Sequence, residues 1–118
     1  MRNRALLRPL VALTIAVSMV VAFGGAAQAA TVVKASGTSF RPRSLSVAAG
    51  TKVVWKAVSG SHTVTAYKGR WTKNSGLPNG GKTSFTFSNP GTYKYFCRFH
   101  GSVSGGVCSG MCGKVTVT

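Results

Sequence analysis

The 118-residue sequence contains no aspartate and no glutamate. Without a side-chain carboxylate, the chain cannot build a paired acid–base site, a Ser-His-Asp triad, or a calcium or magnesium site of the usual oxygen-ligand kind. Its 15 lysines and arginines have no acidic counterpart, so the formal net charge is +15. The missing acids exclude much enzyme chemistry, and the remaining charge should attract anions over long distances.

The first 29 residues have the pattern of a secretory signal peptide. Three arginines lie within the first eight residues, Leu10 to Phe23 is a 14-residue stretch without charge, and Ala27-Gln28-Ala29 fits the small-residue cleavage rule. The stretch is shorter than the about 20 apolar residues of a membrane-spanning helix, which disfavours an anchor. We therefore expect a secreted or periplasmic protein with one folded domain at residues 30–118, which retains 12 positive charges.

Residues 30–118 consist of short segments that are typical of β-strands, and no segment has a helical period. The segments are rich in β-branched and aromatic residues or alternate between polar and apolar residues. Expected strands cover residues 31–35, 44–48, 51–57, 62–67, 82–88, 92–97 and 114–118. This spacing predicts an all-β fold, an antiparallel Greek-key sandwich or barrel of about seven to eight strands.

Two stretches interrupt the strands. Residues 68–81 contain four glycines and Pro78, which predicts a loop with room for one helical turn, and we expect Trp71 to be exposed there. The ten residues between His100 and Met111 also contain four glycines, so we expect this connection to be pliable.

Side chains that bind soft metals are scarce, and four of them stand near expected strand ends. Cys97 ends one strand, His100 follows it, Met111 precedes the last strand, and His62 begins an earlier one. Strand ends that are distant in sequence can meet at one pole of a closed sandwich. Two imidazoles, a thiolate and a weak thioether suit both oxidation states of copper, and they are the general description of a blue-copper site. Zinc prefers four strong ligands. We therefore predict one mononuclear copper site.

The motifs, in this order, resemble the cupredoxin family, in particular its plastocyanin-like secreted type 1 (blue) copper proteins. The resemblance covers nearly all of residues 36–118. It rests on the opening strands from Phe40 to Trp55, on His62-Thr63-Val64, on the segment from Pro90 to His100, and on the segment from Gly110 to Val115.

The resemblance implies a role for each ligand and for two neighbours. His62, Cys97 and His100 would be the equatorial ligands and Met111 the axial one, and electrons would enter and leave through a partly exposed His100. Thr63 would help to hold the ligand loop near the cysteine sulfur, and Phe96 would be an aromatic side chain at a second electron-transfer surface. We do not expect an enzyme, because enzymatic oxidation needs an open coordination position or a second copper cluster, and the sequence has no further histidines to build one.

Cys108 and Cys112 bracket Met111 and depart from the family pattern. We expect them to form a small disulfide, which leaves Cys97 as the odd thiol, free to bind metal. The alternative is a dinuclear copper site, which uses the same Cys-x-x-x-Cys spacing. Such a site needs a histidine and a methionine shortly downstream, and residues 113–118 contain neither.

We therefore expect a secreted, monomeric type 1 copper protein that carries single electrons between redox partners. The alternative is a copper storage or delivery module, or a basic cupredoxin that adheres to surfaces and has no electron-transfer role. The charge favours acidic redox proteins as partners, with an anionic membrane or cell-wall surface as a second possibility. The cations are spread singly along the sequence, which disfavours nucleic acid as a partner.

Overall fold

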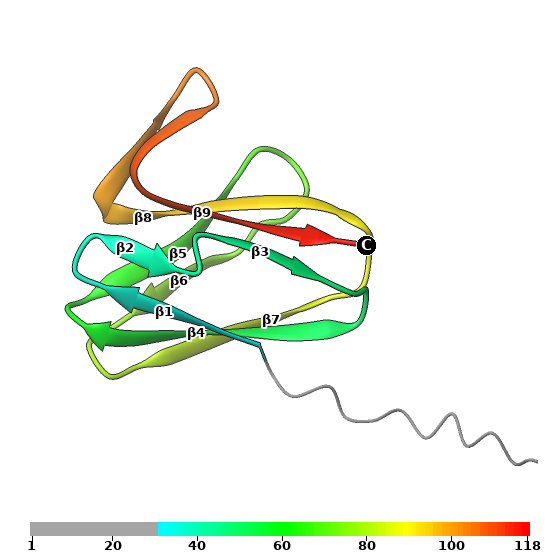
Figure 1. Cartoon of the computed structure of the whole chain (residues 1–118). Helices are drawn as coiled ribbons and strands as arrows, with labels where there is room; N and C mark the ends of the chain where they lie inside the picture. Colours follow the sequence, from blue (N-terminus) through cyan, green and yellow to red (C-terminus); the bar gives the residue numbers. More distant parts are fainter. Residues whose placement is uncertain (1–30) are drawn as a thin grey trace, which may run out of the picture.

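The computed structural model describes residues 31–118, which form nine β-strands in two packed sheets (Figure 1). The predicted signal peptide at residues 1–29 lies outside the described residues. One sheet contains β1 (Thr31–Ser36), β2 (Ser39–Arg41), β4 (Thr51–Ser59) and β7 (Lys82–Phe87). The other contains β3 (Ser44–Val47), β5 (His62–Tyr67), β6 (Asn74–Leu77), β8 (Gly91–Ser104) and β9 (Val107–Val117). The predicted all-β sandwich is confirmed, with nine strands instead of seven to eight.

The strand order is β2-β1-β4-β7 in the first sheet and β3-β9-β8-β5-β6 in the second. Five pairings are antiparallel, but β1 with β4 and β3 with β9 are parallel. The predicted antiparallel arrangement thus describes most of the pairings, and the sequence did not indicate these two parallel pairs. Neither pair is joined by a hairpin, so no tight turn sets their relative direction. Across residues 31–118 no helix is present that could span a membrane.

Strands β2 and β6 were not predicted. β6 lies within the expected loop at residues 68–81, where it pairs with β5 in the register His62↔Leu77 and Thr65↔Asn74. It has four residues, and Leu77 is its single buried side chain. β2 has three residues, with Phe40 buried between two exposed neighbours. Both strands lie at sheet edges and are too short to show the alternation that identifies a strand.

The core between the sheets contains an aromatic cluster, and Trp71 is part of it. Its ring lies 6.1 Å from that of Trp55 and 5.3 Å from that of Phe85, and only 8% of the residue is exposed. Its Nε1–H group donates a hydrogen bond to the Lys94 carbonyl oxygen at 3.0 Å. The prediction of an exposed Trp71 is therefore wrong, because the connection between β5 and β6 folds inward and buries the indole with its polar group satisfied.

The glycine-rich connection after His100 is a regular hairpin, not a pliable loop. β8 and β9 stay paired from Gly101↔Gly110 to Ser104↔Val107, and Figure 1 shows this extension standing away from the sandwich. Gly105 and Gly106 form the two-residue turn with φ values of 56° and 75°. Positive φ at both central residues is the geometry that matches the twist of a hairpin, and glycine adopts it without steric penalty.

Candidate metal centre

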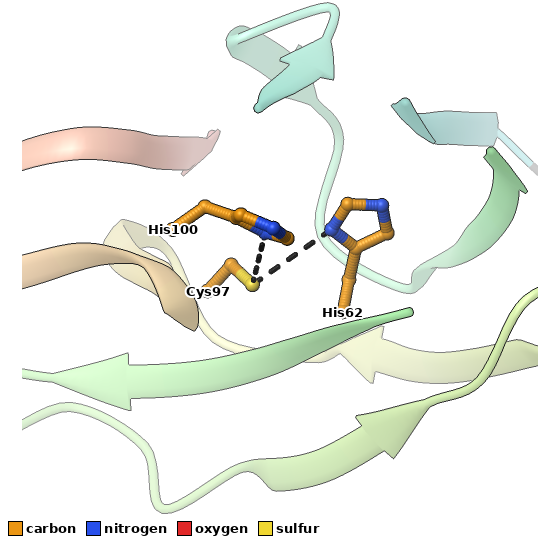
Figure 2. A group of neighbouring side chains, drawn as sticks. All are labelled: His62, Cys97 and His100. Atoms are coloured by element: carbon orange, nitrogen blue, oxygen red, sulfur yellow. Dashed lines mark hydrogen bonds between the residues drawn. The ribbon is translucent and has the colours of Figure 1, made fainter. Parts of the chain in front are cut away.

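Three predicted ligands meet at one end of the sandwich. The Cys97 sulfur lies 3.8 Å from Nδ1 of His62 and 3.5 Å from Nδ1 of His100 (Figure 2). The potential ligand atoms of the three residues all lie within 4.8 Å of one another. His62 comes from the start of β5, whereas Cys97 and His100 come from β8. The fold therefore brings together residues 35 positions apart, as expected for strand ends that meet at one pole.

A bulge in β8 turns Cys97 and His100 toward the same point. The register with β9 pairs Phe96 with Cys112 and then Gly101 with Gly110. Residues 97–100 of β8 are thus opposite a single residue of β9, Met111. Unequal numbers of residues on two paired strands bend the longer one and redirect its side chains. This local kink places the thiol and the imidazole of β8 beside the imidazole of β5.

Met111 lies directly opposite the bulge and is fully buried. The backbones approach closely here, since a Cβ atom on Gly101 would lie 2.8 Å from the Met111 carbonyl oxygen and 3.2 Å from that of Cys97. Glycine is therefore needed at position 101 for the hairpin to begin immediately after the bulge. This position is compatible with the predicted role of Met111 as axial ligand, which stays a prediction.

The imidazole of His62 is oriented by a backbone contact. Its Nε2–H group donates a hydrogen bond to the Ser59 carbonyl oxygen at 2.7 Å. Because that acceptor requires a proton on Nε2, the neutral ring keeps its lone pair on Nδ1, the atom that faces the Cys97 sulfur. A hydrogen bond on the far nitrogen fixes both tautomer and ring orientation, as is usual for histidine ligands.

Thr63 connects the cysteine to its surroundings in two ways. Its backbone N–H group donates to the Cys97 sulfur at 3.4 Å, which stabilises negative charge on that atom. Its hydroxyl oxygen accepts a hydrogen bond from the Arg98 backbone N–H at 2.9 Å, which holds the bulge against β5. Thr63 thus contacts both the sulfur and the loop that carries the candidate ligands, and its supporting role at a metal site stays a prediction.

The Thr63 hydroxyl is the inner end of a short relay. The Thr65 hydroxyl donates to Oδ1 of Asn74 at 3.1 Å, so it accepts the hydrogen bond from Thr63 at 3.0 Å. This relay and the Ser59 carbonyl were missed in the sequence, because Ser59, Thr65 and Asn74 carry no motif. Asn74 belongs to the unpredicted strand β6. The acceptor at Ser59 is a backbone carbonyl, which any residue type could supply, so the sequence cannot reveal it.

Burial differs strongly among the three ligands. His62 is 1% exposed, Cys97 is fully buried, and His100 is exposed. Phe99, which precedes His100, is 63% exposed. The thiol is therefore shielded from solvent, while one imidazole reaches the surface.

Phe96 lies on the outer side of β8, next to Cys97 in sequence. Its ring packs edge-on against Tyr67, with 5.9 Å between ring centroids. The rings of Phe96 and Tyr67 thus pack together on the outer surface of the sheet, one residue away from the candidate ligand Cys97. A role for Phe96 in electron transfer stays a prediction.

A disulfide joins Cys108 and Cys112, with 6.2 Å between their Cα atoms, and Cys97 is a free thiol. The closed ring of residues 108–112 contains Met111. With both sulfurs in the bond, neither can bind a metal as a thiolate. This arrangement disfavours the dinuclear copper alternative.

Two neutral imidazole nitrogens and a thiol that can become a thiolate match the preferences of copper. His62, Cys97 and His100 are therefore positioned to bind one copper ion. The orientation of His62, the shielding of the sulfur and the hydrogen bond from Thr63 are all provided by residues of the protein itself.

Residues 9–108 match the family model of the cupredoxin-like domain. Among solved structures, the chain resembles a purple cupredoxin from Nitrosopumilus maritimus, with a TM-score of 0.61, 22% identity and coverage of 75% of this chain and 99% of that one. It also resembles a reduced mutant of amicyanin, with a TM-score of 0.60, 28% identity and coverage of 75% and 82%.

A third similar structure is the copper-containing nitrite reductase from Thermus scotoductus SA-01, with a TM-score of 0.63 and 22% identity. The match covers 76% of this chain but only 22% of the enzyme, so the similarity concerns one part of a much longer protein. A search of curated proteins finds no match to this sequence.

Proposed function

This chain belongs to the cupredoxin-like domain family, and we propose that it is a mononuclear type 1 copper protein that carries single electrons between redox partners. The observation that supports this function best is the position of Cys97. Its buried sulfur lies 3.8 Å and 3.5 Å from two histidine nitrogens, and only one of these histidines reaches the surface.

A copper ion held by these side chains would supply a one-electron redox couple. The protein supplies a set of ligands that need not move when the electron passes. His62 is held by Ser59, and the bulge carrying Cys97 and His100 is held by Thr63. The nearly complete burial of His62 and Cys97 excludes water from that side of the site. Met111, which is buried beside the bulge, would be the fourth and weaker ligand.

Electron exchange in this proposal takes place at the exposed side of the site. His100 is the one member of the three-residue group that is exposed, and the exposed ring of Phe99 lies 6.5 Å from its imidazole. A partner protein that covers this surface would come close to the metal without opening the sandwich. An electron passing between the metal and the partner would then cross little more than the length of the His100 side chain.

We propose a carrier and not an enzyme because the sequence has only two histidines, and both lie in the candidate centre. No others are left to build a second copper site for substrate. The similarity to nitrite reductase concerns the fold of one part of that enzyme.

We further propose that the protein acts outside the cytoplasm, as one domain spanning residues 30–118, after removal of residues 1–29. The disulfide between Cys108 and Cys112 is of a kind that persists in oxidising compartments. The 12 positive charges favour an acidic redox protein as the partner, since complementary charge accelerates association.

The proposal is tested by the visible spectrum of the copper-loaded protein. We expect intense absorption from charge transfer between the Cys97 thiolate and Cu(II), and complete loss of that absorption in Cys97→Ser. The matched control is the double variant Cys108→Ser with Cys112→Ser, which removes two other sulfurs and should keep the absorption. Reversible copper binding without this absorption would refute the carrier function and would favour storage or delivery of copper.

A further inference from the structure

The outer face of the sheet that supplies no copper ligand carries an unbroken row of four cations. In the register of β2-β1-β4-β7, Lys34 is paired with Arg41 on one side and with Lys56 on the other, and Lys56 is paired with Lys82. Residues directly opposite each other point to the same face of a sheet. All four are exposed, whereas their neighbours Val33 and Trp55 are buried on the inner face. The row therefore crosses the whole sheet, one cation on each strand.

Neighbouring strands are about 4.8 Å apart, so the row spans about 14 Å in a nearly straight line. Like charges that face each other across strands destabilise a sheet. The sequence contains no side-chain carboxylate that could separate or neutralise them. The whole row therefore remains available to an external anion that is itself linear.

The surroundings of the row also limit the kind of anion. The other outward residues of these four strands are valines, serines, a threonine and one more cation: Val32, Ser36, Ser39, Lys52, Val54, Val58, Ser84 and Thr86. No aromatic side chain stands among them. Proteins that bind single-stranded nucleic acids stack the bases on aromatic side chains, and membrane-binding surfaces also use aromatic anchors. This face therefore favours neither a nucleic acid nor a membrane. A shallow hollow of about 280 Å³, lined by Lys52, Lys82 and their neighbours, adjoins one end of the row.

We propose that the row formed by Arg41, Lys34, Lys56 and Lys82 is a binding strip for a linear phosphodiester polymer that lacks nucleobases. Each cation contacts one phosphate group of the polymer, and recognition depends on charge and spacing alone. The strip lies on the sheet opposite the one that contains Cys97 and His100. The polymer therefore holds the protein while the metal centre remains open, and its binding needs no copper.

The test measures binding of the full chain to poly(glycerol phosphate) over a series of salt concentrations. Each phosphate contact contributes about 0.7 to the slope of log affinity against log salt for a flexible single strand. Four contacts predict a slope of about −3 and a loss of affinity of about 50-fold between 50 and 200 mM salt. Each single change, such as Lys56→Gln, is expected to lower the magnitude of the slope by about 0.7.

A matched pair of variants separates the strip from net charge. The strip variant carries Lys34→Gln, Arg41→Gln, Lys56→Gln and Lys82→Gln. The control removes the same charge elsewhere, near or on the other sheet, with Arg43→Gln, Lys68→Gln, Lys94→Gln and Lys114→Gln. We expect the strip variant to lose both affinity and salt dependence, whereas the control keeps most of both. The single variants give the same information if the strip variant does not fold.

Equal losses in the two fourfold variants would overturn the proposal, since net charge alone would then explain binding. Tighter binding to oligo-deoxythymidylate or to vesicles of anionic phospholipid than to poly(glycerol phosphate) would also overturn it. Copper binding is followed in every variant. The strip is independent of the metal site. A negative result for polymer binding therefore does not affect the proposed electron-carrier function, and a negative result for copper does not affect the proposed strip.

Discussion

Replacing Thr63 by valine tests how the protein holds its metal site in place. The change removes one hydroxyl, and with it the acceptor of the 2.9 Å hydrogen bond from the Arg98 backbone N–H. It leaves the backbone N–H that donates to Cys97. An unsatisfied and partly buried donor raises the free energy of the folded state by about 1–2 kcal/mol. For a domain of this size, that corresponds to a melting temperature lower by roughly 4–8 °C for each kcal/mol.

The assay is thermal unfolding of the metal-free protein, combined with the visible spectrum of the copper form. We expect Thr63→Val to lower the melting temperature and to shift the charge-transfer absorption, because the bulge carrying Cys97 and His100 loses one support. Thr65→Val is the control. It removes only the next hydroxyl of the relay, and the Thr63 hydroxyl can still accept from Arg98. Equal melting temperatures for the two variants, or an unshifted spectrum in Thr63→Val, would show that the hydrogen bond between Arg98 and the Thr63 hydroxyl does not position the site.

Three further predictions concern the hairpin and the core. Gly101→Ala should destabilise the fold and disturb the copper absorption, because its Cβ atom would lie 2.8 Å from a backbone oxygen of the opposite strand, whereas Gly76→Ala, which meets no atom within 4 Å, should leave the absorption unchanged. Replacing both Cys108 and Cys112 by serine should reduce the free energy of unfolding by about 2 kcal/mol, measured with denaturant, since the closed loop is short. Burial raises the pKa of Tyr95 from 10.0 to about 12, so the neutral form is favoured in the fold, and the stability present below pH 10 should be lost as pH rises from 10 to 12. Tyr95→Phe should remove this part of the alkaline loss, and an unchanged pH profile in that variant would contradict the assignment.

The sequence predicted those parts of the fold in which inward and outward residues alternate. The strand that carries Tyr93, Tyr95 and Cys97 is predictable because its residues alternate, and the structure buries all three side chains on one face. β2 and β6 escaped because each has a single inward residue and lies at a sheet edge. The Gly105-Gly106 pair is a turn signal for the hairpin, but the four glycines of residues 101–110 favour a pliable connection when only the sequence is considered.

The three ligands of the candidate centre were found in the sequence because so few residues could serve. The chain has two histidines and one cysteine outside the disulfide, so the number of possible metal ligands is small from the composition alone. The bulge that brings Cys97 and His100 together was not predictable, because it depends on the register between β8 and β9 on both sides of residues 97–100. The hydrogen bond between His62 and Ser59 was equally hidden, since it depends on backbone geometry alone.

The parallel pairing of β3 with β9 has a consequence for the order in which the protein can fold. Thr118 donates hydrogen bonds to Val47, 71 positions earlier in the chain. β9 is also the partner of β8, so the second sheet and the bulge at residues 97–100 are complete only once β9 has paired. Contacts this distant in sequence form slowly, because a long loop must close first.

Before β9 has paired, the Cys97 thiol is not yet buried and could form a disulfide with Cys108 or Cys112. Cys108 and Cys112 are separated by four positions, so loop closure brings their sulfurs together about 5-fold more often than it brings Cys108 to Cys97. The nearest pair therefore oxidises first and leaves the cysteine that the metal needs. We therefore expect the spacing of the three thiols along the unfolded chain to favour the pairing of Cys108 with Cys112 even before the last strand is in place.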